Sequence, residues 1–154
     1  MNLSAVTAGN MVITDPAFTD GFKSEQAFKQ AFIGYIRQKQ ARGAPEVFEV
    51  ENEEKEPGFP DLLVVHTSGY MAGQAQFFEM KVADKSGAFH MEPTQPRFYK
   101  AHPHLDISVV VWHRGCVSII RADDVADKAL ERTSLRLNVR DFRRQYDAAE
   151  VFDS

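Results

Sequence analysis

One stretch of the sequence, residues 58–81, constrains the fold of this chain more than any other. It opens with Gly-Phe-Pro-Asp, closes with Phe-Phe-Glu-Met-Lys, and predicts two strands joined by a loop. The apolar run over residues 61–67 follows a proline and is typical of a strand. Two glycines mark a turn over residues 68–74, and residues 75–81 are expected to form the second strand.

Two carboxylates and one ammonium group meet on this predicted hairpin. Glu79 and Lys81 share one face of the second strand, because side chains alternate along a strand. If the antiparallel hairpin closes around Met71, Asp61 lies opposite Lys81 and diagonal to Glu79, about 5–8 Å apart at Cβ. Asp61 and Glu79 could then share one hard cation. A Glu-x-Lys tripeptide alone is more often a solvated edge pair, but the apolar neighbours predict buried strands, where a carboxylate needs a partner or a metal.

The order of these residues resembles the signature of the PD-(D/E)XK nuclease superfamily. The signature residues are Pro-Asp at 60–61 and Glu-Met-Lys at 79–81, at the end of the next expected strand. Gln95 resembles the glutamine that follows the E-x-K strand in the VRR-NUC and Holliday-junction-resolvase-like branches, and Glu25 resembles the helical glutamate of those branches. The resemblance covers residues 24–112, over half of the chain.

This resemblance implies a divalent-metal-dependent nuclease that hydrolyses phosphodiester bonds in DNA, with a preference for branched or junction DNA as one expectation. Asp61 and Glu79 would hold Mg²⁺ or Mn²⁺ together with the main-chain carbonyl of Met80. Lys81 would orient or deprotonate the attacking water and neutralise charge on the phosphate. The low molecular weight and the resolvase-like pattern also make a homodimer plausible.

Two further residues acquire a role only through the resemblance. Gln95 would position the water or the phosphate, although by itself it is an ordinary residue for the start of a helix. Glu25 would assist through water or a second metal ion. On its own it is equally well explained as an acidic residue that favours the positive end of the helix macrodipole.

The totals predict a single soluble domain. With 154 residues the chain can bury a substantial core, and we expect an arm over residues 1–21 followed by one nuclease-like domain over residues 22–154. Cys116 is the only cysteine, so no internal disulfide can form. The sequence shows neither a membrane-spanning apolar run nor a signal peptide, so a cytoplasmic protein without membrane contact is expected.

The charge distribution is uneven. The formal net charge of −4 counts against a DNA-binding protein, and six glutamates between residues 46 and 56 form a cluster that is expected to be a solvated loop rather than a metal site. Residues 81–121, in contrast, carry six Lys and Arg against three Asp and Glu. Lys85, Arg97 and Lys100 from this segment are therefore the expected contacts to DNA phosphates, with Arg97 and Lys100, like Gln95, expected on or near the side of the site.

The remaining patterns predict an α/β fold with a restriction-endonuclease-like core, a mixed sheet of about five strands flanked by helices in the order α-β-β-β-α-β-β-α. Helices are expected over residues 25–40, after an N-cap at Ser24, from residue 95 after a cap at Thr94, and from 121–124 to about 132. Strands are expected at residues 47–51, 106–113 and 116–121, the last two joined by Arg-Gly. Residues 135–139 alternate like a strand, and residues 142–152 could be helical.

Other polar clusters have simpler explanations. His90, His102 and His104 lack the cysteine pair or His-Glu-x-x-His spacing of zinc sites and are expected to be surface residues. The arginines between residues 136 and 144 could contact DNA, or could face solvent or a second copy of the chain. A catalytically inactive protein of the same fold, binding nucleic acid or another protein, remains the alternative, because fold alone does not determine function.

Overall fold

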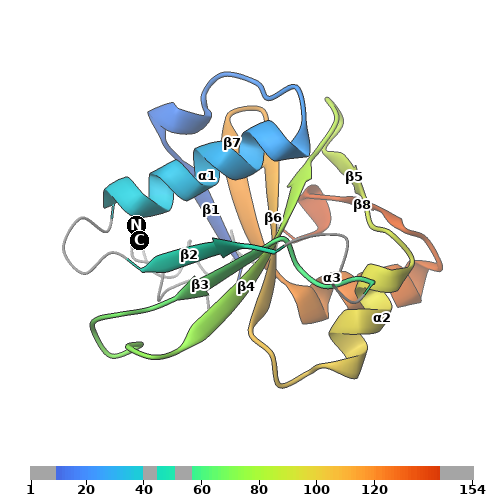
Figure 1. Ribbon diagram of the computed structural model, residues 1–154. Helices are drawn as coiled ribbons and strands as arrows, with labels where there is room; N and C mark the ends of the chain where they lie inside the picture. The colour runs from blue at the N-terminus through green and yellow to red at the C-terminus, as the bar shows by residue number, and fades with distance from the viewer. Residues whose placement is uncertain (1–9, 40–44, 51–56, 143–154) are drawn as a thin grey trace, which may run out of the picture.

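A computed structural model describes residues 10–39, 45–50 and 57–142. These residues form an α/β fold in which helices flank a mixed six-stranded sheet, as Figure 1 shows. In chain order the elements are β1 (Met11–Thr14), the short 3₁₀ helix η2 (Pro16–Phe18), α1 (Glu25–Lys39), β2 (Glu46–Glu49), β3 (Leu62–Val65), β4 (Ala75–Val82), β5 (Ala88–His90), α2 (Thr94–Ala101), β6 (Ile107–His113), β7 (Cys116–Arg121), α3 (Ala122–Arg132) and β8 (Arg136–Asn138).

The two middle strands of the sheet, β4 and β6, run parallel, and the order across it is β1-β7-β6-β4-β3-β2. All other pairs in this sheet are antiparallel. Val109, Val110 and Val111 of β6 are fully buried, which confirms the prediction that this strand is covered on both faces. The coarse α/β prediction is therefore confirmed, with one more strand than expected because β1 joins the edge.

The helices cover the sheet from two sides (Figure 1). On one side, α1 buries Phe28, Phe32 and Ile36 against Leu62 and Phe78 of the hairpin strands. The cap of α1 is the predicted one, since Ser24 Oγ accepts a hydrogen bond of 3.1 Å from the N–H of Ala27. On the other side, α2 and α3 pack on β6 and β7 through a second apolar cluster. Each face of the sheet thus has its own core.

The N-terminal arm expected over residues 1–21 docks on the sheet from residue 10 onward. Its strand β1 pairs with β7 from Met11↔Ile119 to Thr14↔Cys116. Phe18 follows and is fully buried, and its carbonyl accepts a hydrogen bond of 2.8 Å from Trp112 Nε1. The pairing could not be read from the sequence because the partner strand lies about a hundred residues away.

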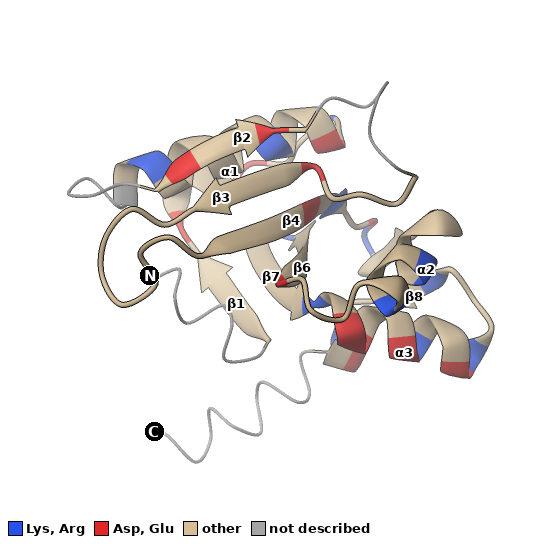
Figure 2. Cartoon of the chain, turned by 60° about the horizontal axis from the view of Figure 1, so that its bottom comes forward, with Lys and Arg blue, Asp and Glu red and all other residues tan. Residues whose placement is uncertain are grey.

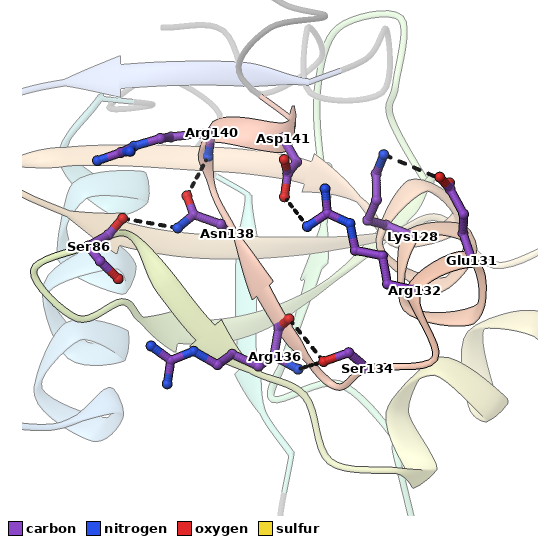
Figure 3. A network of polar contacts seen from close by, with 9 residues as sticks. All are labelled: Ser86, Lys128, Glu131, Arg132, Ser134, Arg136, Asn138, Arg140 and Asp141. Atoms are coloured by element: carbon purple, nitrogen blue, oxygen red, sulfur yellow. Dashed lines mark hydrogen bonds and ion pairs between the residues drawn. The ribbon is translucent and has the colours of Figure 1, made fainter.

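A second, two-stranded sheet joins β5 and β8, so the alternating pattern over residues 135–139 does form a strand. Figure 3 shows how polar contacts hold this part of the chain. Asn138 Nδ2 donates to the carbonyl of Ser86 at 3.0 Å, and Arg132 pairs with Asp141 at 2.7 Å. The helix considered over residues 142–152 lies almost wholly outside the described residues.

The hairpin of β3 and β4 forms as predicted, but its register differs by two residues. The pairs run from Leu62↔Phe78 to Val65↔Ala75, which sets Asp61 level with Glu79, not with Lys81. The ladder continues through His66, whose N–H donates to the carbonyl of Gln74 at 3.0 Å, so the loop is residues 67–73. A shift by two keeps every side chain on its predicted face, because the strand repeat is two residues.

Among the described residues, no helix is long and apolar enough to cross a membrane.

Candidate functional site

A polar pocket of about 260 Å³ lies where the chain before β3 leaves its partner β4. It contains all five side chains that the sequence singled out as catalytic, although they come from four separate parts of the chain. The described residues that line it are Glu25, Gln26, Lys29, Asp61, Glu79, Lys81, Glu92 and Gln95. Its walls are the first turns of α1, the residue before β3, the last residues of β4 and the start of α2.

The close approach of two chain segments creates this arrangement. Gly58 has a φ of +89°, and a Cβ atom built there would lie 2.4 Å from the carbonyl oxygen of Thr94 and 2.8 Å from Phe98 Cβ. Only glycine tolerates both the positive φ and this contact. The segment that leads to Asp61 can therefore rest directly on the first turn of α2, which brings Asp61 and Gln95 into one pocket.

The carboxylate of Asp61 replaces a main-chain partner in the sheet. Asp61 Oδ2 accepts a hydrogen bond of 3.1 Å from the N–H of Met80, beyond the last β3–β4 pair. The side chain of Met80 is buried in the core beneath α1, so Met80 can contribute to the pocket only through its main chain. Asp61 therefore lies against the end of β4 that carries Glu79 and Lys81.

Glu79 and Lys81 are charged side chains in an almost fully buried position. Only 4% of Glu79 and 6% of Lys81 is exposed, and both residues line the pocket from the same face of β4. Removing a charge from water costs several kcal/mol unless opposite charges or hydrogen bonds compensate. This cost is roughly as large as the whole free energy of unfolding of a small domain. Burial on this scale argues against the solvated edge pair that the tripeptide alone would suggest.

Glu25 reaches into the pocket from the exposed surface of α1. Partial burial of its carboxylate raises its pKa above the usual value, and the negative charges of Asp61 and Glu92 raise it further. Lys81 and the N–H of Val82 act in the opposite direction and lower this pKa. These influences show that Glu25 lies within electrostatic reach of the other charged groups of the pocket.

Gln95 has a fixed orientation. Its Oε1 accepts a hydrogen bond of 2.8 Å from the N–H of Glu92, and a main-chain N–H can only donate. The amide NH₂ therefore is the end that can donate to a ligand. The predicted cap at Thr94 is wrong: α2 already begins at Thr94, the N-cap position is Pro93, and Gln95 satisfies the N–H that precedes the helix.

Four residues of the neighbourhood were not predicted from the sequence. Gln26, Lys29 and Glu92 line the pocket. The fourth is Tyr99, which is fully buried and whose hydroxyl has no hydrogen-bond partner within the described part of the chain. Burial raises the pKa of Tyr99 well above its usual value, and the charges of Glu79 and Asp61 raise it further.

Helical spacing was the available signal for two of these residues. Tyr99 lies four residues after Gln95, and Lys29 lies four residues after Glu25, so each shares a helix face with a residue already singled out. Glu92, in contrast, enters the pocket because the chain turns before α2, which local sequence does not show.

The three lysines and arginines expected to bind DNA lie elsewhere. Arg97 and Lys100 line a separate, mainly apolar groove between α2 and α3, and Lys100 forms an ion pair with Asp127. Neither residue lines the polar pocket, although both were expected on or near its side, because residues two and five positions after Gln95 along a helix point away from it. Lys85 is exposed in the turn between β4 and β5.

The donor set suits a hard divalent cation. The described lining residues include four carboxylates and two ammonium groups, a formal excess of two negative charges. Among the described residues, however, no three His, Cys, Asp or Glu side chains are drawn together tightly enough to hold a metal by themselves. A Mg²⁺ ion would need only one or two of these carboxylates, because it keeps several waters and is commonly bound through one or two carboxylates plus substrate phosphates.

Comparisons with protein-family models, with curated proteins and with solved structures give no match to this chain. The chemistry of the pocket and the resemblance of its residues to a nuclease signature are therefore the grounds on which a function is proposed.

Proposed function

We propose that this protein is a divalent-metal-dependent deoxyribonuclease with a restriction-endonuclease-like core of the PD-(D/E)XK type. The observation that carries the proposal is the meeting of Asp61, Glu79 and Lys81 in one pocket with Glu25 and Gln95. A binding protein has no evident need for two carboxylates and an ammonium group, two of them almost fully buried, at one point. Apart from the short strand β5, the order of the elements from α1 to β7 also agrees with the order expected for that core.

Asp61 and Glu79 would hold Mg²⁺ or Mn²⁺, joined by the main-chain carbonyl of Met80. When bound, the ion would make water a stronger nucleophile at neutral pH and would offset negative charge on the phosphate. The buried position of Glu79 suits this role, because a cation would compensate a carboxylate that solvent barely reaches.

The other side chains of the pocket would act on the water and the phosphate. The ammonium of Lys81 would orient the attacking water and donate to a phosphate oxygen as negative charge develops there. The NH₂ group of Gln95 would donate to the same phosphate or to the water. Glu25 would accept a proton from the water, and its raised pKa favours that role because a general base works best when its pKa approaches the working pH.

A second candidate, a catalytically inactive module that binds nucleic acid or a protein, is favoured by one observation. The net charge is −4, and the exposed edge strand β2 is acidic at both ends, as Figure 2 shows. A surface of this sign repels phosphates. The activity assay below discriminates between the two candidates.

The test is cleavage of end-labelled DNA. Duplex, single-stranded, flapped and four-way-junction substrates are incubated with the protein in Mg²⁺, in Mn²⁺ or in EDTA. In a separate measurement, light scattering at the same protein concentration reports whether the protein is a homodimer. We expect cleavage in either metal and none in EDTA. DNA that stays intact under every metal condition, or a Glu79→Gln variant that cuts DNA as fast as the wild type, would contradict the proposal and favour the binding module.

A further inference from the structure

Lys29 is a second cation of the pocket, and its present partner lies on the rim. Lys29 is on α1, one turn after Glu25, and lines the pocket with 15% of its side chain exposed. Its Nζ lies 3.2 Å from Glu49 Oε1 on the edge strand β2. Gln30 Nε2 donates to the same oxygen at 2.8 Å. Glu49 itself is 47% exposed, so the pair spans the boundary between pocket and solvent.

The pair is positioned beside the proposed metal ligands. The N–H of Val50, next to Glu49, donates to the main-chain carbonyl of Asp61 at 2.9 Å, so β2 continues its pairing up to the edge of the pocket. Lys81 is buried at the end of β4, whereas Lys29 lies on the α1 wall. The two ammonium groups therefore serve different parts of one pocket.

The Lys29–Glu49 pair can exchange its anion. An ion pair with one partner half exposed contributes little, about a fivefold change in an equilibrium constant at most. A phosphate oxygen is an equally good acceptor for an ammonium group and carries its charge into the pocket. Gln26, three residues before Lys29 on the same helix, lines the pocket too and can donate a second hydrogen bond through its NH₂ group.

We propose that Lys29 and Gln26 form a phosphate subsite on the α1 wall, and that Glu49 pairs with Lys29 until a phosphate displaces it. The inference rests on the proposed nuclease function and names a further contact to the same substrate. This contact is to the phosphate that neighbours the cleaved phosphate along the same strand. Glu49 then has a defined effect. Its carboxylate lowers the affinity for phosphate by competing for the Lys29 ammonium.

The first test replaces Lys29 by Met, which keeps most of the aliphatic stem. We expect the KM for cleavage of labelled DNA to rise about tenfold with kcat nearly unchanged, because one charge-assisted contact is lost and the residues around Asp61 and Glu79 remain. The slope of log K against log[salt] for DNA binding in Ca²⁺ should fall by about 0.9. Lys128→Met is the matched control, since Lys128 also pairs with a glutamate, Glu131, but on α3. A Lys29→Met protein that equals this control would overturn the proposal.

The second test asks whether Glu49 acts through Lys29. Glu49→Gln keeps an oxygen for Gln30 but removes the competing charge, so DNA affinity should rise about two- to fivefold. In a protein that already carries Lys29→Met, the same change should have a clearly smaller effect. An equal gain in both backgrounds would show that Glu49 only repels DNA at a distance, and would overturn the competition.

A third measurement separates this inference from the proposed activity. Inorganic phosphate is titrated into the intact protein in Mg²⁺, and the amide resonances of α1 are followed. We expect saturable shifts near residues 26–29 in the wild type and in Lys128→Met, weakened about tenfold in Lys29→Met. If the wild type cuts no DNA but shows this dependence on Lys29, the nuclease proposal falls and the phosphate subsite stands. If no saturable shift occurs, or Lys29→Met retains it, the subsite falls whatever the activity.

Discussion

Replacing Asp61 by Asn should separate the structural role of this side chain from its proposed role as a metal ligand. Asn retains an oxygen that can accept the hydrogen bond from the N–H of Met80, now 3.1 Å, and loses only the negative charge. Ala loses both and leaves a buried donor without its acceptor, which costs about 1–3 kcal/mol. We therefore expect Asp61→Ala to lower the free energy of unfolding by about 1–3 kcal/mol and Asp61→Asn by about 1 kcal/mol or less.

The metal-dependent readouts should not distinguish the two variants. At a Mg²⁺ concentration 100 times its dissociation constant, binding should stabilise the wild type by about 2.7 kcal/mol, which corresponds to a rise in Tm of about 5–10 °C for a chain of this size. Both Asp61 variants should lose most of this rise and should cut DNA about a hundredfold more slowly or worse. Thermal unfolding with and without Mg²⁺, and single-turnover cleavage, measure the two effects.

A matched control lies at the opposite end of β4. The carboxylate of Asp106, like that of Asp61, accepts a hydrogen bond, in this case from Gln76 Nε2 at 3.3 Å. Asp106→Asn should keep both the Mg²⁺-dependent rise in Tm and the cleavage rate. The reasoning would be refuted if Asp61→Asn cut DNA at the wild-type rate, or if Mg²⁺ raised its Tm as much as that of the Asp106 variant.

Three further predictions concern the neighbours of Asp61. Lys81→Met should cut DNA about 10²–10⁴-fold more slowly, because it loses the ammonium group that acts on the water and the phosphate. It should bind Mg²⁺ at least as tightly as the wild type, because the pocket becomes more negative. Single-turnover rates and calorimetric titration measure the two effects, and cleavage at the wild-type rate would contradict the prediction. The pKa of Glu25 in the folded protein is raised above 4.5, so the folded protein binds more protons at this residue than the unfolded chain does. The free energy of unfolding therefore falls as the pH rises from about 4.5 through that raised pKa. Glu25→Gln should remove this fall, so in urea unfolding its free energy of unfolding should exceed that of the wild type by an amount that grows with pH above 4.5. The difference should stay below about 1 kcal/mol, because solvent reaches the side chain. A difference that does not change with pH would contradict this prediction. Tyr99→Phe should leave the free energy of unfolding unchanged or raise it by about 1 kcal/mol, since it removes a buried hydroxyl without a described partner, whereas a clear loss in urea unfolding would reveal one.

Local sequence was sufficient to predict most of the individual elements. The helix over Glu25–Lys39, its cap at Ser24 and the buried strand β6 follow from periodicity and short-range hydrogen bonding. The tight turn at Arg114 and Gly115, both with positive φ, was equally readable, since such a pair between two apolar runs is typical of a hairpin. These features depend on residues within a few positions of one another, so the local chain determines them.

Five of the residues that line the pocket were also selected from the sequence, but only through a resemblance. Asp61, Glu79, Lys81, Gln95 and Glu25 were selected by their order along the chain, and the structure brings all five to one pocket. Nothing in their local periodicity required this. The contact of Gly58 with the first turn of α2 made it possible, and a contact between segments about 35 residues apart has no local signature.

Tertiary structure alone decided the details on which the proposed chemistry depends. The hairpin register differs by two residues from the expected one because loop bonds around His66, not strand periodicity, select it. Arg97 faces the α2–α3 groove because α2 is rotated to bury Tyr99 beside the site. Lys29 became a candidate phosphate contact only because the structure places it in the pocket, next to Glu49 of β2. Sequence thus determined which groups the chain carries and the local conformation that presents them, while packing between distant segments determined which groups face one another, because burial and electrostatic pairing depend on distances in space.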